Sequence, residues 1–356
     1  MKLKFHGKKI SGILAVLPET EVLFDDEVDN YSFSASQTLR LKKIMGFEKH
    51  RIAKQETATS DLCVFGLASL MERNLIDPKE IGAILVATIT PDYFMPHVCN
   101  IIHGRFDLPD ETLCMDIPQG CCAFELGLMQ AFLLLERMEN KKVVLFNADV
   151  LSHKASKHDR NSFPLIGDAA TITILENDSS FSDIYFHMKT DGTRCNALMI
   201  PSGGSRLPCS NETAEMKEDE EGNIRSLDNL IMDGTAVFQF VQHDVPPLIE
   251  ETISEAGITK DEIEHYLFHQ PNKFMLRKLA EKLEIPLEKT PMNIVENFGN
   301  PSGASVPLLI AHNLADAMIR KRSTCCLSAF GSGLAWCAMI MQLGEMDFCE
   351  KIVSNL

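Results

Sequence analysis

The sequence lacks any uninterrupted apolar run of about 18 residues, the length that a helix needs to cross a bilayer. Its first ten residues, MKLKFHGKKI, are basic but contain no apolar stretch of the kind that a secretory signal requires. Hydrophobic residues make up 45% of the 356 residues and charged residues 24%, which is ordinary for a soluble globular protein. We therefore expect a cytoplasmic protein that does not enter a membrane.

The cysteines lack the spacing that metal sites use. There are eleven, but none belongs to a CxxC pair or to a Cys/His cluster of zinc-finger type. Disulfide frameworks are typical of small secreted domains, a class that this chain does not fit. Most cysteines, such as Cys325, Cys326 and Cys337, stand among apolar residues, where free cysteine behaves as a small core hydrophobe. We expect no bound metal, and one or two cysteines remain for a chemical role.

Basic residues are in deficit, with 34 Lys and Arg against 50 Asp and Glu and a net charge of −16. This balance argues against a nucleic-acid partner. Six acidic residues gather between Glu212 and Glu221, a stretch that we interpret as a solvated loop. One basic run stands against this background, either as a solvated helix face or as a docking site for phosphate or an acidic partner. It comprises Arg40, Lys42, Lys43, Lys49, Arg51 and Lys54.

Strand-like and helix-like segments alternate along the chain. Ile81–Thr90 is an almost continuous apolar and β-branched run, as in a strand that is buried on both faces. Leu276, Leu279, Ala280 and Leu283 have the spacing of one helix face. The alternation predicts an α/β fold in which helices cover central sheets. Further strands are expected at Val143–Asn147, Ala170–Leu175, Tyr266–Phe268 and Thr324–Ala329.

The composition changes over residues 177–230, where polar residues and glycine replace the apolar runs. The change suggests that the chain has two halves. Each half contains strand–helix segments and then a late pair of apolar strands, which hints at an internal duplication.

The most informative stretch is CMDIPQGCCAFELGL, residues 114–128. Pro118 and Gly120 permit a sharp turn, so that Cys121 falls on the first turn of a helix. The partial positive charge at a helix N terminus favours the thiolate, which is the nucleophilic form of cysteine. The helix that follows is apolar nearly all round and is expected in the protein interior. The pattern alone fits either of two alternatives, a buried nucleophile or a plain core cysteine.

Three shorter signals follow in the second half. His269 ends a strand and precedes a helix, where α/β proteins collect functional groups. Residues 297–307, NFGNPSGASVP, form a turn before a helix. Residues 329–336, AFGSGLAW, form a turn after a strand, and such a turn can offer free N–H groups to an oxyanion. Each signal also has a structural explanation, as a strand-end histidine, a helix-start turn or a tightly packed turn.

Taken in this order, the motifs make a specific pattern. The sequence resembles ketoacyl-ACP synthase III, the initiating condensing enzyme of fatty-acid synthesis in the thiolase superfamily, over nearly its whole length. The resemblance implies a thiolase-like fold of two duplicated α/β halves, residues 1–178 and 179–356, in a five-layered αβαβα architecture. The matching motifs are DIPQGCCAF (116–124), HDRNSFPLIGDAA (158–170), MDGTAVFQF (232–240), HQPN (269–272), GNPSGASVP (299–307) and AFGSGLAW (329–336).

The resemblance implies a role for each matching residue. Cys121 takes the place of the acyl-accepting nucleophile, with Phe124 packed near it in the acyl pocket. His269 and Asn300 match the pair that holds the extender thioester and stabilises the enolate formed when a malonyl group loses carbon dioxide. The main-chain N–H groups of Cys121 and Ser332 would form a second oxyanion hole, for acyl transfer.

Departures from the family pattern concern the site that binds the acyl donor. Arg40 stands where the family has an adenine-stacking tryptophan, and Ile44 stands where it has an arginine. Phe274 replaces the arginine that follows the HQxN motif, with Arg277 one turn further on, whereas Arg160 is retained. We therefore expect weak coenzyme A binding and delivery of the acyl group by an acyl carrier protein, although acyl-CoA stays possible.

The resemblance also implies a homodimer with pockets completed across the interface. The bulky aromatic residue that shapes the acyl pocket from the partner subunit becomes Met95 here. The substrates would be acyl-CoA or acyl-ACP and malonyl-ACP, and no metal or redox cofactor is implied.

We accordingly predict a β-ketoacyl-ACP synthase of type III that transfers an acyl group to Cys121 and then performs a decarboxylative Claisen condensation. One alternative is an acyltransferase of the same fold that acts on a hydroxyl or amine without forming a carbon–carbon bond. Another is a supporting subunit of a heteromeric synthase. The joint presence of Cys121, His269 and Asn300 disfavours both.

Overall fold

A six-stranded sheet forms one half of the framework. In spatial order its strands are β17 (Phe348–Val353), β2 (Lys8–Leu17), β8 (Ala169–Asn177), β7 (Lys142–Asp149), β5 (Ile81–Ala87) and β6 (Leu113–Ile117). The computed structural model describes residues 1–356. The pairs β2–β8 and β8–β7 are antiparallel, and the other pairs are parallel.

A five-stranded sheet forms the other half. Its strands, in spatial order, are β1 (Lys2–Phe5), β9 (Ile184–Thr190), β16 (Ala335–Leu343), β15 (Ser323–Gly331) and β14 (His265–Phe268). Only β14 and β15 run parallel. All the strands expected from apolar runs are present, but the first ends at Ala87 instead of Thr90. The chain turns there because Thr88 and Thr90 donate hydrogen bonds to the buried carboxylate of Asp149, at 2.9 and 3.1 Å.

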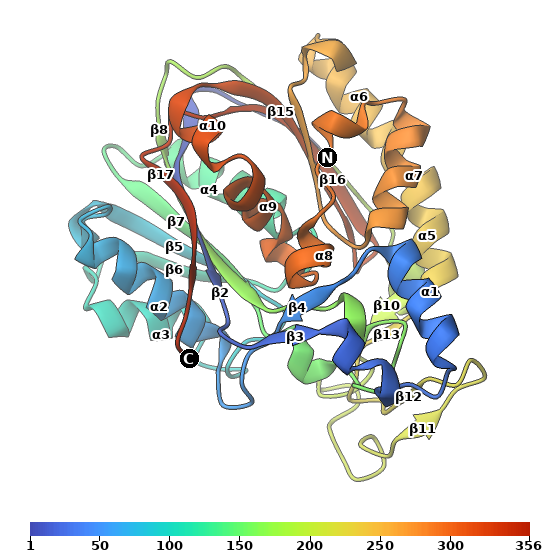
Figure 1. Cartoon of the computed structure of the whole chain (residues 1–356). Helices are drawn as coiled ribbons and strands as arrows, with labels where there is room; N and C mark the ends of the chain where they lie inside the picture. Colours follow the sequence, from blue (N-terminus) through green and yellow to red (C-terminus); the bar gives the residue numbers. More distant parts are fainter.

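The helices and the two sheets make five layers, which confirms the predicted architecture (Figure 1). The central layer packs between the sheets and consists of α4 (Ala123–Leu135) and α9 (Ser305–Asn313). On the outer face of the six-stranded sheet lie α2 (Thr59–Glu72) and α3 (Val98–Phe106). On the outer face of the five-stranded sheet lie α5 (Gly234–His243), α6 (Val245–Ala256) and α7 (Lys273–Leu283).

The central layer is apolar nearly all round because one sheet packs on each of its two faces. The hydrophobic cluster around α4 and α9 is the largest in the protein, with 43 buried residues. Three further helices are α1 (Ala35–Met45), α8 (Ile294–Phe298) and α10 (Ala315–Arg320). None of the helices combines the length and the hydropathy that a bilayer span requires.

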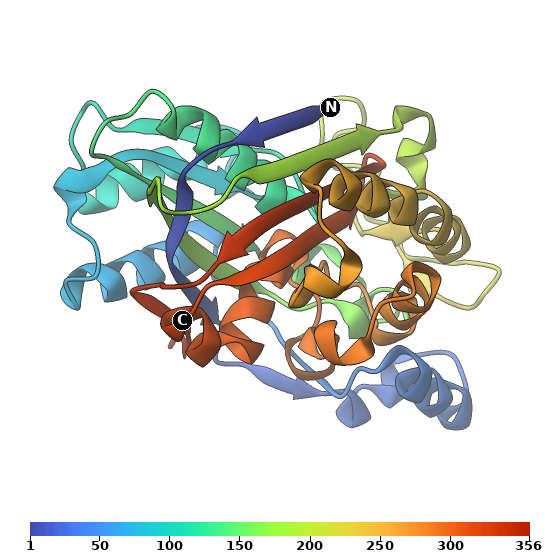
Figure 2. The same cartoon turned by 90° about the horizontal axis from the view of Figure 1, so that it is seen from above.

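The terminal strands each join the sheet built mainly from the other half of the sequence. β1 extends the five-stranded sheet beside β9, and β17 extends the six-stranded sheet beside β2, as Figure 2 shows from above. The expected boundary at residues 178–179 falls in the link between β8 and β9, where the chain passes from one sheet to the other. The assignment of the two halves as domains stays a prediction.

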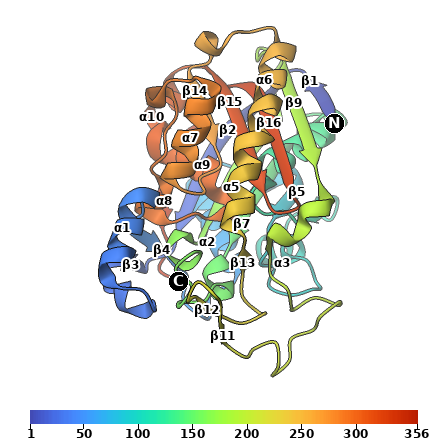
Figure 3. The same cartoon turned by 90° about the vertical axis from the view of Figure 1, so that its right-hand side faces the viewer.

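The polar region after β9 contains only short strands. These are β10 (Leu198–Met199) paired with β13 (Ile231–Met232), and β11 (Lys217–Glu218) paired with β12 (Ile224–Arg225); a further pair near the N terminus joins β3 (Glu21–Leu23) to β4 (Lys49–Arg51). Figure 3 shows the β11–β12 hairpin at the edge of the molecule, below α1. The acidic side chains of this hairpin are mostly exposed, which agrees with the expected solvated loop.

Candidate active site

Cys121 lies in the tight link between β6 and α4. The main-chain N–H of Ala123 donates to the carbonyl of Gly120 at 2.7 Å, and α4 begins directly after Cys122. Cys121 is partly exposed, whereas Cys122 is completely buried and its thiol faces the carbonyl of Ala335 at 3.3 Å. Of the two neighbouring thiols, only that of Cys121 is accessible to a substrate.

The turn after β15 packs directly on the Cys121 thiol. A methyl group added at Gly331 would come within 2.5 Å of the Cys121 Sγ, so only glycine leaves room for the thiol. The next residue, Ser332, donates a main-chain hydrogen bond to this thiol. Ser332 is held in place because its Oγ donates to the Leu198 carbonyl at 3.2 Å. The two main-chain donors expected around an acyl oxygen, those of Cys121 and Ser332, therefore lie together.

The acidity of the thiol differs from the sequence-based expectation. Burial among protein atoms raises the pKa of Cys121 to about 11, although hydrogen bonds from the main chain of Ser332 and of Cys121 itself act in the opposite direction. Asp149 and Glu125 also raise this pKa through their charges. The predicted benefit of the helix N terminus is thus outweighed by loss of hydration. In the free protein Cys121 is a thiol.

His269 follows β14 immediately and enters the centre of the molecule. Its main-chain N–H donates to the Ser328 carbonyl at 2.9 Å, and its Nδ1 lies 2.8 Å from the Oγ of Ser305, on α9. The residue is 2% exposed, and this burial lowers the pKa of the imidazole to about 3, against the effect of a main-chain hydrogen bond to Ser302. At neutral pH the ring is therefore uncharged.

Asn300 is placed by a sharp turn after α8. Gly299 has a φ of 78°, and a side chain there would come 2.5 Å from the carbonyl of Ile166. Asn300 is anchored through its main chain, which donates to Leu165 at 2.6 Å. Its side-chain Oδ1 accepts a hydrogen bond from the Ser302 main chain at 3.0 Å, and this bond orients the amide. The amide nitrogen has no protein acceptor and is free to donate to a bound molecule.

Residues 300–305 bring the separate parts of the site together. Ser302 bonds with its main chain to both Asn300 and His269, and a side chain at Gly120, next to the cysteine, would touch the Ser302 hydroxyl at 3.4 Å. Cys121, His269 and Asn300 thus converge at one place between the sheets, as their motifs predict. Ser302 and Ser305 were missed as site residues, although both stand in the GNPSGASVP motif.

The two residues expected in the acyl pocket have different surroundings. Phe124 is completely buried on α4, three residues after Cys121, and belongs to the central core. Met95 is 81% exposed in the loop between β5 and α3, beside Tyr93 and Phe94, which are exposed as well. Within a single chain, therefore, the Met95 side chain lies at the surface.

A surface groove runs between α1 and α7, where the donor site was expected. Ile44 and Phe274 line it, and the Phe274 ring stacks on Phe238 with centroids 5.6 Å apart. Arg277 lines it as well, and Arg40 is exposed on the neighbouring turn of α1. The full lining consists of Leu39, Lys42, Lys43, Ile44, Gly46, Glu48, Lys273, Phe274, Arg277 and Glu296.

Much of the expected basic docking surface is neutralised within the protein. Lys42 forms ion pairs with Asp25 and Glu48 at 2.9 and 2.6 Å, and Lys49 and Arg51 share Glu21. Lys273 pairs with Glu296 at 3.1 Å and Lys278 with Glu281 at 2.7 Å. Lys42, Lys49 and Arg51 of the basic run are therefore paired within the protein and are less available to an acidic partner. The cations near the groove without a carboxylate within 4.0 Å are Arg40, Lys43 and Arg277.

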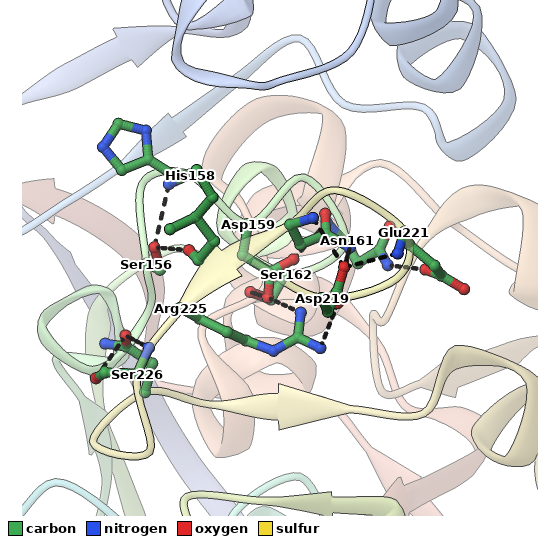
Figure 4. Close-up of polar contacts among 12 residues, drawn as sticks. Ser156, His158, Asp159, Asn161, Ser162, Asp219, Glu221, Arg225 and Ser226 are labelled. Atoms are coloured by element: carbon green, nitrogen blue, oxygen red, sulfur yellow. Dashed lines mark hydrogen bonds and ion pairs between the residues drawn. The ribbon is translucent and has the colours of Figure 1, made fainter. Parts of the chain in front are cut away.

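Arg160 lies away from this groove, in the loop that the acidic hairpin covers. Its guanidinium stacks on the ring of Phe33, 3.2 Å from the centroid, and burial lowers its pKa. Figure 4 shows the polar contacts that fix the loop to the hairpin. Asp159 binds Arg225 at 3.2 Å, and Asn161 donates to Glu221 at 2.9 Å. The Arg160 side chain is thus held by the protein itself and is not among the residues that line the groove.

Comparison with known proteins gives a consistent result. Residues 115–192 match the family model for 3-oxoacyl-[acyl-carrier-protein (ACP)] synthase III, and residues 253–343 match the model for the C-terminal part of that enzyme. A putative 3-oxoacyl-[acyl-carrier-protein] synthase 3 of Campylobacter jejuni is 30% identical over 350 residues, which is 97% of each chain. A β-ketoacyl-[acyl-carrier-protein] synthase III of Latilactobacillus sakei is 33% identical over 291 residues, 81% of this chain and 86% of the relative.

Solved structures show the same similarity. The crystal structure of a 3-oxoacyl-(acyl-carrier protein) synthase from Burkholderia xenovorans superposes with a TM-score of 0.91 and 31% identity over 99% of both chains. A second 3-oxoacyl-(acyl-carrier-protein) synthase III structure gives a TM-score of 0.87 and 26% identity, over 94% of this chain and 99% of the other. The matched segments contain Cys121 and Arg160 in the first half and His269, Asn300 and Ser332 in the second.

Proposed function

Because the chain belongs to the 3-oxoacyl-[acyl-carrier-protein] synthase III family, we propose that it joins an acyl group to a malonyl thioester, with Cys121 as the acyl carrier. The observation that supports this most directly is the convergence of an accessible thiol, an uncharged buried imidazole and an unpaired amide. A thiol nucleophile and two uncharged hydrogen-bond donors are what the two half-reactions require.

In the first half-reaction the Cys121 sulfur attacks the carbonyl carbon of an acyl thioester. The negative charge that develops on the carbonyl oxygen is stabilised by the main-chain N–H groups of Cys121 and Ser332. The carbon–sulfur bond to the donor then breaks, and the donor leaves as a thiol that carries the proton lost by Cys121. A pKa of about 11 makes the thiolate scarce, so removal of this proton contributes to the barrier.

In the second half-reaction a malonyl thioester binds with its carbonyl oxygen between His269 and Asn300. Loss of carbon dioxide leaves an enolate, whose oxygen accepts hydrogen bonds from the imidazole and from the Asn300 amide. The enolate carbon attacks the carbonyl carbon of the Cys121 thioester, the carbon–carbon bond forms as the carbon–sulfur bond breaks, and Cys121 leaves as a thiolate that takes up a proton from solvent. A neutral His269 suits this step because its N–H can donate a hydrogen bond to the enolate oxygen. The neutral imidazole is too weak an acid to protonate the enolate.

We further propose that a carrier-protein thioester is the preferred acyl donor. The groove between α1 and α7 offers an apolar floor of Leu39, Ile44 and Phe274. Unpaired cations flank this floor and would attract an acidic partner surface, whereas no aromatic ring in the lining besides Phe274 is available to stack on an adenine. Phe274 is already stacked on Phe238.

A homodimer is the proposed assembly. Tyr93, Phe94 and Met95 expose 62%, 82% and 81% of their surface in one short loop, and so dense an apolar patch is typical of an interface. The adjacent β6 is an edge strand of the six-stranded sheet, with one side of its backbone unpaired by any other strand. A second copy that covers this loop would bring Met95 toward an acyl pocket.

The test is a two-stage incubation followed by intact-mass measurement. The protein is first treated with matched acyl-CoA and acyl carrier protein thioesters and then with malonyl carrier protein. We expect the mass of one acyl group on Cys121, followed by its loss with release of carbon dioxide and a 3-oxoacyl product. Transfer of the acyl group to a hydroxyl or amine acceptor without use of malonyl thioester would contradict the proposal and favour the acyltransferase alternative.

A further inference from the structure

Glu125 is a buried acid in the immediate neighbourhood of Cys121. It lies in the first turn of α4, four residues after the cysteine, and has no exposed surface. Cys121 stands two residues before the start of α4, and Glu125 is among the groups whose charge acts on its thiol. The carboxyl group therefore shares one interior region with the nucleophile.

Neither oxygen of this carboxyl group has a hydrogen-bond partner in another residue, and only its own main-chain N–H lowers its pKa. Other buried acids of the protein have partners, although one oxygen of Glu27 has none. Asp149 accepts from the main chain of Ile89 at 2.8 Å and from two threonines, and Asp168 accepts from the Ala53 main chain at 2.8 Å. Leaving a buried acid unsatisfied is unfavourable, so the fold does not gain stability from Glu125.

The groups that face Glu125 are acidic or neutral. They are the thiols of Cys121 and Cys122 beside its own helix, Cys337 on β16 and Cys326 on β15, and Glu125 raises the pKa of each. No cation contributes to the titration of Glu125 itself. Asp149, on β7, is the other carboxyl that acts on Cys121. A negative charge on Glu125 thus meets no compensating charge.

We propose that Glu125 is a positioning residue that controls the ionisation of Cys121, so that the neutral carboxyl permits thiolate formation and the carboxylate suppresses it. The inference rests on the proposed role of Cys121 as the nucleophile. Its physical basis is that two acids in one poorly hydrated region do not readily ionise together.

The charge state of Glu125 changes in an accessible pH range. Burial raises the pKa of its carboxyl group to about 8. Below this pH the group is neutral and exerts no charge on Cys121. Above it the carboxylate opposes removal of the thiol proton, and repulsion between two negative charges in partly hydrated protein lowers the thiolate fraction about tenfold.

The test compares wild-type protein with Glu125→Gln, which keeps the shape and removes the ionisation. Alkylation of Cys121 by iodoacetamide is measured by peptide mass spectrometry between about pH 6.5 and pH 9.5, a range that spans the titration of Glu125. Cys195 is exposed and serves as an internal reference for reagent and pH. Glu136→Gln, at the exposed end of the same helix, is the matched control.

We expect equal alkylation rates for variant and wild type at the lowest pH and a roughly tenfold faster rate for Glu125→Gln at the highest. Glu136→Gln should match wild type throughout. A rate that is lower in Glu125→Gln at every pH would overturn the proposal and identify Glu125 as a proton acceptor for the thiol. A ratio that does not change with pH would show that the two groups are uncoupled.

Two features keep the result interpretable. Glu125→Met is also uncharged at all pH values and close in volume, and it should reproduce the pH-dependent ratio if Glu125→Gln does not fold. Alkylation requires neither donor nor malonyl substrate. A protein that fails to condense acyl groups would therefore still give a clear answer about Glu125 and Cys121.

Discussion

The Nδ1 atom of His269 lies 2.8 Å from the Oγ of Ser305, and both residues are buried between the two sheets. Ser305 is the first residue of α9, so the central helix layer fixes the orientation of a side chain that arrives from the end of β14. The hydrogen bond at Nδ1 leaves the opposite ring nitrogen to face the site. This pairing links the fold of the second half to the proposed enolate-stabilising step.

Removal of the Ser305 hydroxyl should impair condensation more than acylation. In Ser305→Ala the imidazole loses its orienting partner, and we expect malonyl decarboxylation to fall roughly 10- to 100-fold, as for loss of part of an oxyanion site. Acylation of Cys121, which uses main-chain donors, should stay within about threefold of wild type. Ser323→Ala is the control, because that buried hydroxyl lies at the start of β15, at the opposite end of the strand from Gly331. An equal loss in both half-reactions would indicate a general structural effect instead.

A methyl group at Gly331 should block the nucleophile. The added carbon in Gly331→Ala would lie 2.5 Å from the Cys121 Sγ and 2.6 Å from its Cβ, which displaces the thiol from the Ser332 main chain. We expect the acylation rate to fall at least about 100-fold, as when an oxyanion donor is lost. Acylation is measured by intact mass. Gly192→Ala, where nothing lies within 4 Å of the new methyl group, should behave as wild type.

Only one of the adjacent cysteines should carry the acyl group. Cys121 is partly exposed, whereas Cys122 is completely buried against β16 and its pKa is raised well above the usual value by Cys337 and by burial. Cys121→Ala should abolish acylation and Cys122→Ala should retain most of it, as judged by mass spectrometry of the digested, acylated protein. A label on Cys122, or one that survives Cys121→Ala, would contradict the assignment.

The sequence was sufficient for the architecture and for the places of the candidate site residues in it. Apolar runs such as Ile81–Ala87 located strands because a strand covered on both faces has little choice of residue type. The positions of Cys121, His269 and Asn300 next to strand or helix ends followed from the turn residues around them. Their meeting in space is a consequence of topology. Cys121 precedes α4, His269 follows β14 and Asn300 follows α8, and these elements all border or belong to the central layer.

Pairings between distant residues could not be predicted. Lys42 belongs to a basic run in the sequence, yet Asp25 and Glu48 neutralise it in the fold. Helix position suggested a reactive thiolate at Cys121, but burial decides its pKa, and burial depends on the whole packing around Gly331. The burial of Glu125 could not be predicted either, since it also depends on tertiary packing. A glutamate at a helix start is common on protein surfaces, so the sequence did not mark this one as unusual.

Burial of an uncharged His269 should make the protein less stable in acid. The folded pKa is about 3 and the ordinary value is 6.5, so between these values the unfolded chain binds a proton that the folded protein does not. The stabilisation present above pH 6.5 is therefore lost as the pH falls, at up to about 1.4 kcal/mol per pH unit. Chemical denaturation of wild type and His269→Gln between pH 4 and 7 should show that the free energy of unfolding falls less on acidification in the variant. Parallel curves would refute this account.

Removing the unpaired cations of the donor groove should slow acylation by a carrier-protein thioester. Lys43 and Arg277 line the groove and have no carboxylate within 4.0 Å, so their charge is available to a partner. In the double variant Lys43→Gln/Arg277→Gln we expect the acylation rate with an acyl carrier protein to fall roughly tenfold at low salt, because steering depends on charge. The difference should shrink as salt is added, since ions screen charges separated by more than about 10 Å at 0.1 M.

The matched control uses a lysine of the same groove that is already neutralised. Lys273 pairs with Glu296 at 3.1 Å, so Lys273→Gln also frees a carboxylate; the double variant Lys273→Gln/Glu296→Gln removes the pair without changing the net charge. This control should acylate at nearly the wild-type rate with the carrier protein. With the matched acyl-CoA, neither double variant should show a salt-dependent loss as large as that seen with the carrier protein. If wild type is acylated equally well by both donors at every salt concentration, the groove does not select a carrier protein, and Arg40, Ile44 and Phe274 accommodate coenzyme A in place of the family's usual residues.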